Sequence, residues 1–190
     1  MSASISAIPY YLPGTWAIDP MHSHMRFSVR HFGFHHAAGT MTVGGTVVVA
    51  DQPLDSAVEA VIDLASVDSG NPGRDNAIRS GPLLDVARRP TADYRSIALE
   101  SDCAAGRATS FVLHGELTLL GVTKQVPLRI DVEFLPSPDE HRILVLGRGR
   151  LERRDFDLRY HRGPRVLDRT IASTVDIAVR IDGRRKGSKL

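Results

Sequence analysis

Cysteine, aromatic residues and long apolar runs are scarce in this chain, and each scarcity argues against a class of protein. Cys103 is the one cysteine among 190 residues, so no internal disulfide can form and a reducing, cytoplasmic location is expected. No segment approaches the roughly eighteen apolar residues of a membrane-spanning helix. Residues 1–15 contain neither a basic start nor an apolar run, so no secretion signal is predicted. We therefore expect a single soluble domain.

Signatures of catalysis and of phosphate binding are also missing. The sequence contains no Gly-x-Ser-x-Gly motif, no glycine-rich phosphate loop and no recognisable pair of catalytic carboxylates. The formal net charge is only +2, and the arginines gather between residues 148 and 169. Such a basic stretch is more often a solvated face or a head-group site than a nucleic-acid interface. No catalytic residue and no nucleic-acid partner are predicted.

Apolar and polar residues alternate along much of the sequence. Residues 21–31 alternate with the two-residue period of a β-strand. Met25, Phe27 and Val29 share one face, which ends in His31, whereas other histidines and the arginines occupy the opposite face. One face can be buried while the other is solvated. An apolar face with a polar end is what a strand lining a cavity with a polar mouth would present.

Strand-like segments of this kind follow one another from residue 15 to residue 181. The clearest is 125–135, in which apolar side chains alternate with charged ones. Gly44 and Gly45 predict a two-residue hairpin turn between strands 40–43 and 46–50. Residues 121–124 predict another turn, and residues 153–165 a long basic connection.

One short helix is predicted, over residues 72–80. Asn71 is a favourable N-cap, Pro72 suits the first helical turn, and Gly81 with Pro82 ends the run. About nine strands with one helix indicate an all-β antiparallel barrel or sandwich. A closed barrel of about eight strands has no exposed edge and can hold one small ligand, which favours the barrel. The sandwich is the alternative.

Several sequence blocks keep the order of a known family. They include TWAID (15–19), FSVRH (27–31), ASVDSGN (65–71), RD (74–75), RS (79–80), GELT (115–118), GVTK (121–124) and RDF (154–156). Together these blocks resemble the YceI-like family of lipocalin-like, polyisoprenoid-binding proteins. One departure is Gly-Pro-Leu-Leu at 81–84, where the family usually carries Asp or Glu and two aromatic residues.

The resemblance implies an extended, eight-stranded antiparallel barrel over residues 14–182, with the helix near one mouth. Residues 1–13 would form an N-terminal extension and residues 183–190 a basic, disordered tail. The implied function is non-enzymatic binding, transport or storage of a long-chain isoprenoid, such as an isoprenoid quinone, or of a fatty-acid-like lipid, with no other cofactor. The residues expected to bind this ligand are Met25, Phe27, Val29, His31, Ile62, Arg74, Arg79, Phe111, Leu113, Leu117, Leu128 and Ile130.

Competing interpretations exist for these residues. His31 could donate a hydrogen bond to the ligand head, bond a backbone carbonyl in the core, or act as the base of an enzyme for a small hydrophobic substrate. Arg74 and Arg79 suit an anionic head group such as a diphosphate, or carboxylate partners within the protein. The apolar residues could instead pack a solid core. The histidines at 22–36 lack further ligands in a zinc-binding pattern, so no metal site is predicted, and a homodimer is left open.

Overall fold

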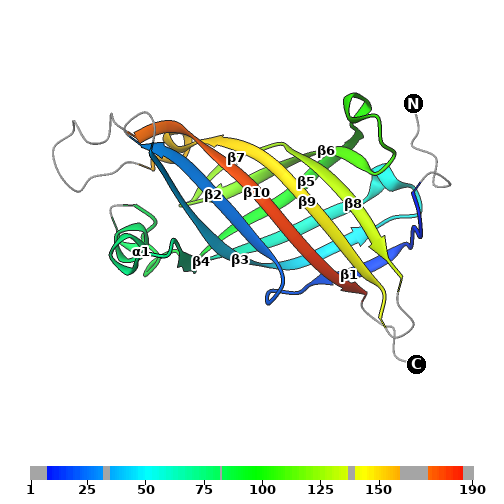
Figure 1. Ribbon diagram of the computed structural model, residues 1–190, viewed down its shortest axis with the longest axis horizontal. Helices are drawn as coiled ribbons and strands as arrows, with labels where there is room; N and C mark the ends of the chain where they lie inside the picture. Colours follow the sequence, from blue (N-terminus) through cyan, green and yellow to red (C-terminus); the bar gives the residue numbers. More distant parts are fainter. Residues whose placement is uncertain (1–7, 32–34, 82, 137–139, 159–170, 186–190) are drawn as a thin grey trace.

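The computed structural model describes residues 8–31, 35–81, 83–136, 140–158 and 171–185, with the backbone alone at His31 and His35 (Figure 1). The strands are β1 (Gly14–Ile18), β2 (His24–His31), β3 (His35–Val49), β4 (Ala57–Asp68), β5 (Thr91–Ser101), β6 (Ser110–Leu119), β7 (Val122–Gln125), β8 (Leu128–Leu135), β9 (Arg142–Glu152) and β10 (Ile171–Arg185). The helical elements are α1 (Pro72–Arg79) and the 3₁₀ turns η2 (Pro53–Asp55), η3 (Cys103–Ala105) and η4 (Arg153–Phe156). None of these described helices is long and apolar enough to cross a membrane.

Antiparallel pairing closes the sheet on itself. Each strand in the order β10–β2–β3–β4–β5–β6–β8–β9 pairs with the next, and β9 pairs with β10. This ring confirms the predicted eight-stranded barrel, and the sandwich alternative is wrong. Outside the ring order, β1 pairs with both β3 and β10, and β7 pairs with β6. The helix α1 lies at one end of the barrel, and the described N-terminal segment lies at the other (Figure 1).

The predicted hairpin at Gly44 and Gly45 is wrong, because β3 continues through both glycines. The first part of β3 pairs with β2 and the last part with β1, while β4 follows it on the other side. Gly45 has a φ of +130°, and a Cβ there would lie 2.2 Å from the carbonyl oxygen of Glu59. The glycines therefore let one long strand bend and change partner without ending it.

Two other local predictions had different outcomes. The turn placed at residues 121–124 is shorter and begins earlier, with positive φ at Leu120 and Gly121, after which β7 pairs back onto β6. Two consecutive positive φ values are typical of a tight hairpin turn. The helix is confirmed, because α1 begins at Pro72 and the side-chain oxygen of Asn71 accepts a hydrogen bond from the Arg74 amide at 3.0 Å.

The ordered barrel extends beyond both predicted boundaries of 14 and 182. Ile8 is buried in the core, and the Tyr11 hydroxyl donates a hydrogen bond to the Ala50 carbonyl at 2.5 Å. At the other end, Gly183 and Arg185 belong to β10 and pair with β1, so they are not part of a disordered tail. The predicted connection at 153–165 begins with η4, and its remainder from 159, like residues 1–7 and 186–190, lies outside the described residues.

Candidate ligand-binding cavity

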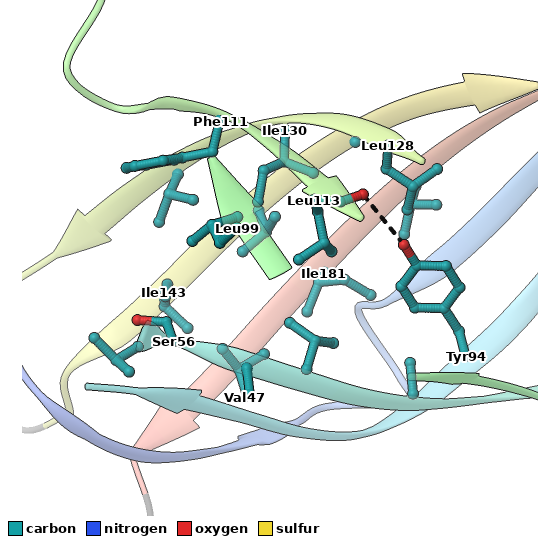
Figure 2. A pocket seen from close by; sticks show the side chains of 18 of the residues that line it. Val47, Ser56, Tyr94, Leu99, Phe111, Leu113, Leu128, Ile130, Ile143 and Ile181 are labelled. Atoms are coloured by element: carbon teal, nitrogen blue, oxygen red, sulfur yellow. Dashed lines mark hydrogen bonds between the residues drawn. The ribbon is translucent and has the colours of Figure 1, made fainter. Parts of the chain in front are cut away.

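An apolar cavity of about 120 Å³ lies inside the barrel, in the half away from α1. Its wall consists mainly of inward-facing side chains of the ring strands, and Figure 2 shows several of them converging, among them Val47, Leu99, Ile143 and Ile181. The half nearer α1 is filled instead by buried side chains outside this lining, including Leu64, Val67, Leu84, Leu119 and Phe156. The barrel is therefore part solid core and part cavity.

The hydroxyls of Tyr11 and Ser56 mark one end of the cavity, next to Ile8 and Pro53. Ser56 Oγ accepts a hydrogen bond from the Ala50 amide at 3.1 Å, while Tyr11 donates to the carbonyl of the same residue. The Tyr11 ring also packs edge-on against Phe134, with centroids 5.2 Å apart. Burial is the main reason why the pKa of Tyr11 is raised. This end combines an apolar wall with hydroxyl groups.

Tyr94 closes the cavity on the side opposite Ser56, as Figure 2 shows. Its side chain is only 8% exposed, and its hydroxyl donates to the carbonyls of Val126 at 3.1 Å and Leu113 at 3.5 Å. Burial raises its pKa well above the usual tyrosine value. The ring occupies the space over Gly115, where a Cβ would lie 2.3 Å from ring atoms. Tyr94 thus forms the floor of the cavity.

Most of the predicted apolar residues line this cavity. They are Met25, Ile62, Phe111, Leu113, Leu117, Leu128 and Ile130. Phe27 and Val29 lie further along β2, outside the lining, and the Phe27 ring packs against the backbone of Gly39. The side chain of His31 is not among the described groups; its backbone pairs with His35 and Ile171.

Arg74 and Arg79 also lie outside the lining, on α1 at the other end of the barrel. Arg79 donates from Nε to the Ala65 carbonyl at 2.9 Å and from Nη2 to the Val67 carbonyl at 2.5 Å. Asp75 is held nearby, because its carboxylate accepts bonds from the amide and hydroxyl of Ser69, and these bonds lower its pKa. In this position Arg79 ties α1 to β4.

We expect Arg79→Gln to lower the free energy of unfolding by about 2 kcal/mol, because it removes charged donors from two strand carbonyls. Arg74→Gln is the matched control on the same helix, since Arg74 is exposed and its amide bond to Asn71 survives the change. Urea denaturation of both variants measures the difference. Equal stability of the two variants would contradict a structural role for Arg79.

The described histidines of the 22–36 cluster lie at the surface. His22 Nδ1 is 2.9 Å from a carboxylate oxygen of Asp19, and His24 and His36 are exposed. Among the residues that the structure describes, no group of three or more His, Cys, Asp or Glu side chains could hold a metal ion.

The model of the YceI-like domain matches residues 16–182. The chain belongs to the YceI-like family. It is 31% identical to a UPF0312 protein of Azotobacter vinelandii over 174 residues, which are 88% of this chain and 84% of the relative. It is 26% identical to Protein YceI of Escherichia coli O157:H7, covering 87% of this chain and 83% of the relative.

Solved structures with this fold include BcnA of Burkholderia cenocepacia, with a TM-score of 0.72, 17% identity, and coverage of 87% of this chain and 98% of that chain. A polyisoprenoid binding domain from Saccharophagus degradans, implicated in plant cell wall breakdown, gives a TM-score of 0.67 at 21% identity, covering 90% and 98%. At these identities the likeness shows the barrel fold.

The departure of this YceI-like chain at residues 81–84 affects the solid half of the barrel. Leu84 is buried in the core, and its amide donates to the Ile78 carbonyl at 3.1 Å. None of the described residues of this segment lines the cavity. Gly81, Leu83 and Leu84 therefore lie away from the candidate site.

Proposed function

We propose that this YceI-like protein binds the apolar tail of an isoprenoid-type or other amphiphilic lipid in the cavity, and carries or stores it without chemical change. The supporting observation is the lining itself: among its residues only Tyr11, Ser56 and Tyr94 have a hydroxyl, amide or charged group, and each of those hydroxyls has a hydrogen-bond partner. Such a wall offers burial to an apolar chain and places no carboxylate, imidazole, thiol or amine beside it. The solved polyisoprenoid binding domain with the same fold is consistent with this proposal.

The size of the cavity bears on the ligand. An engineered cavity of about 150 Å³ takes up benzene, so about 120 Å³ suits one five-carbon unit. At roughly 0.8 kcal/mol per buried CH₂, that unit contributes about 4 kcal/mol, which exceeds one neutral hydrogen bond several-fold. A longer tail would enter by displacing side chains at the Tyr11 end, where the hydroxyls of Tyr11 and Ser56 would meet the head group.

His31 as a catalytic base is the competing function. His31 lies six residues along β2 from Met25, the residue of that strand that lines the cavity. At about 3.3 Å per residue, this places the two backbones roughly 20 Å apart. The separation favours a binding protein over an enzyme that uses this cavity. The cytoplasmic location, the long chain and the isoprenoid quinone stay predictions.

Native mass spectrometry of protein purified without detergent, followed by organic extraction, tests the proposal. We expect a mass above that of the bare chain and an extracted molecule with an apolar tail. Repeated preparations that carry no lipid, and that also fail to bind added geraniol or farnesol, would contradict it. Comparing these two alcohols, which differ by one five-carbon unit, shows how much tail the barrel can admit.

A further inference from the structure

An open trough of about 780 Å³ crosses the outer surface of the barrel over β2, β10, β9, β8 and β6. The first four of these strands run side by side on the near face in Figure 1. The arginines Arg26, Arg129, Arg148 and Arg150 line it, and small or apolar residues such as Ala178 and Val112 lie between them. The trough differs from the internal cavity in chemistry, because four arginines and the carboxylate of Asp176 line it.

Strand register places three of these arginines in one row across the sheet. Arg148 pairs directly with Arg129 on one side and with Ala178 on the other, and Ala178 pairs in turn with Arg26. Directly opposed side chains on one face have Cβ atoms about 5 Å apart, so Arg129 and Arg148 are close like charges. Arg26 lies about 10 Å from Arg148, on the far side of Ala178.

Carboxylates in the described part of the chain neutralise only two of the four arginines in the trough. Arg150 pairs with Asp176 at 2.8 Å, and Arg129 lies 3.4 Å from Asp102. For Arg26 and Arg148, no carboxylate among the described residues lies within ion-pair distance. A cross-strand pair of like charges is unfavourable by itself. An anion supplied by a partner would therefore stabilise the row.

The surroundings of the row indicate a bilayer as that partner. Leu146 is 45% exposed on the same face, where it pairs with Arg180 on one side and, on the other, with Asp131, whose carboxylate is itself paired with Arg107. Cationic side chains around an exposed aliphatic residue suit a membrane interface, since arginine binds lipid phosphate bidentately while the apolar group enters the head-group region. Strands β2, β6, β8, β9 and β10 place no Phe, Tyr or Trp on the outer face for nucleic-acid bases to stack on, and the imidazole in the trough lining is that of His114.

We propose that this arginine trough docks the protein onto the surface of an anionic phospholipid bilayer, with Arg26 and Arg148 contacting lipid phosphates. Docking goes beyond the proposed cavity function and does not depend on it, because it uses the outer face of the wall. A protein that binds no lipid in its cavity would still dock, and a lipid carrier without docking would still retain its ligand.

Sedimentation with vesicles tests the docking surface. Vesicles of phosphatidylcholine and phosphatidylglycerol are compared with vesicles of phosphatidylcholine alone, at low and high salt. We expect binding to the anionic vesicles only, weakened by salt, and reduced about tenfold or more in the double variant Arg26→Gln with Arg148→Gln. Lysine at both positions should retain most of the binding, because the positive charge is kept.

The matched control removes two positive charges from a part of the surface outside the trough. Arg88 and Arg95 are exposed, and both lie outside the trough, on the turn after α1 and on β5. Arg88→Gln with Arg95→Gln should leave vesicle binding within about twofold of the parent protein. Three results would each overturn the proposal. They are an equal loss of vesicle binding in both double variants, equal binding to uncharged vesicles, and release of the protein from vesicles by inorganic phosphate or by a DNA duplex at constant ionic strength.

Discussion

Gly115→Ala is expected to lower the free energy of unfolding by about 3 kcal/mol or more. The new Cβ would lie 2.3 Å from the ring and hydroxyl of Tyr94, which is buried and bonded to the Val126 carbonyl. Overpacking a dense core costs about 1–3 kcal/mol, and displacing the ring adds the loss of a buried hydrogen bond, about 1 kcal/mol. Residue 115 on β6 and Tyr94 on β5 are both held in the barrel wall, so neither can move far enough to relieve the clash.

Urea denaturation followed by the fluorescence of Trp16, which is fully buried, measures this effect. Gly147→Ala is the matched control, because a Cβ there would make ordinary contacts with Ile130 at 3.4 Å and Val179 at 3.6 Å. We expect Gly147→Ala to stay within about 1 kcal/mol of the parent protein. In a Tyr94→Leu background the cost of Gly115→Ala should shrink, since its partner ring is gone. Equal costs at the two glycines would refute the packing argument.

Gly147→Leu is expected to abolish most ligand binding while the barrel stays folded. Gly147 lines the cavity, and a Cβ there would already be in ordinary contact with Ile130 and Val179, so the rest of a longer side chain would have to extend into the cavity. A leucine there would occupy the volume of three to four ligand carbons. At roughly 0.8 kcal/mol per CH₂, the loss is about 3 kcal/mol, or a weakening of about one hundredfold.

Calorimetric titration with farnesol measures the change in binding, and urea denaturation confirms that the fold survives. Val61→Leu adds bulk on the outer face of β4, where Val61 is exposed, and should leave binding unchanged. Gly147→Ala should give an intermediate effect. If Gly147→Leu bound farnesol as tightly as the parent protein, the ligand would have to lie elsewhere.

Local patterns in the sequence account for much of the barrel wall. The alternation predicted for residues 125–135 is confirmed by buried Val126, Leu128, Ile130 and Phe134. The Asn71 cap predicted the start of α1, because capping depends on a few adjacent residues. Closure between β2 and β10 is expected only from strand number and the family resemblance, because pairing between segments so far apart in sequence leaves no local pattern.

The cavity was less predictable, because its shape depends on which side chains fill the barrel. Phe27 has the same alternation as Met25, yet it lies in the solid half while Met25 lines the cavity. No local pattern distinguishes Tyr94, because its place over Gly115 depends on the pairing of β5 with β6. The hairpin predicted at Gly44 and Gly45 is wrong because a bend within a strand and a turn between strands require the same backbone freedom, which glycine provides in both cases.

The pairing of β10 bears on how the protein is made. This strand follows all the other described strands in sequence, and it pairs with β2 on one side and with β9 on the other. A chain still emerging from the ribosome without β10 would leave both of those edges unpaired. Edges of this kind recruit other chains, so a translation pause before residue 171 would expose the nascent protein to aggregation.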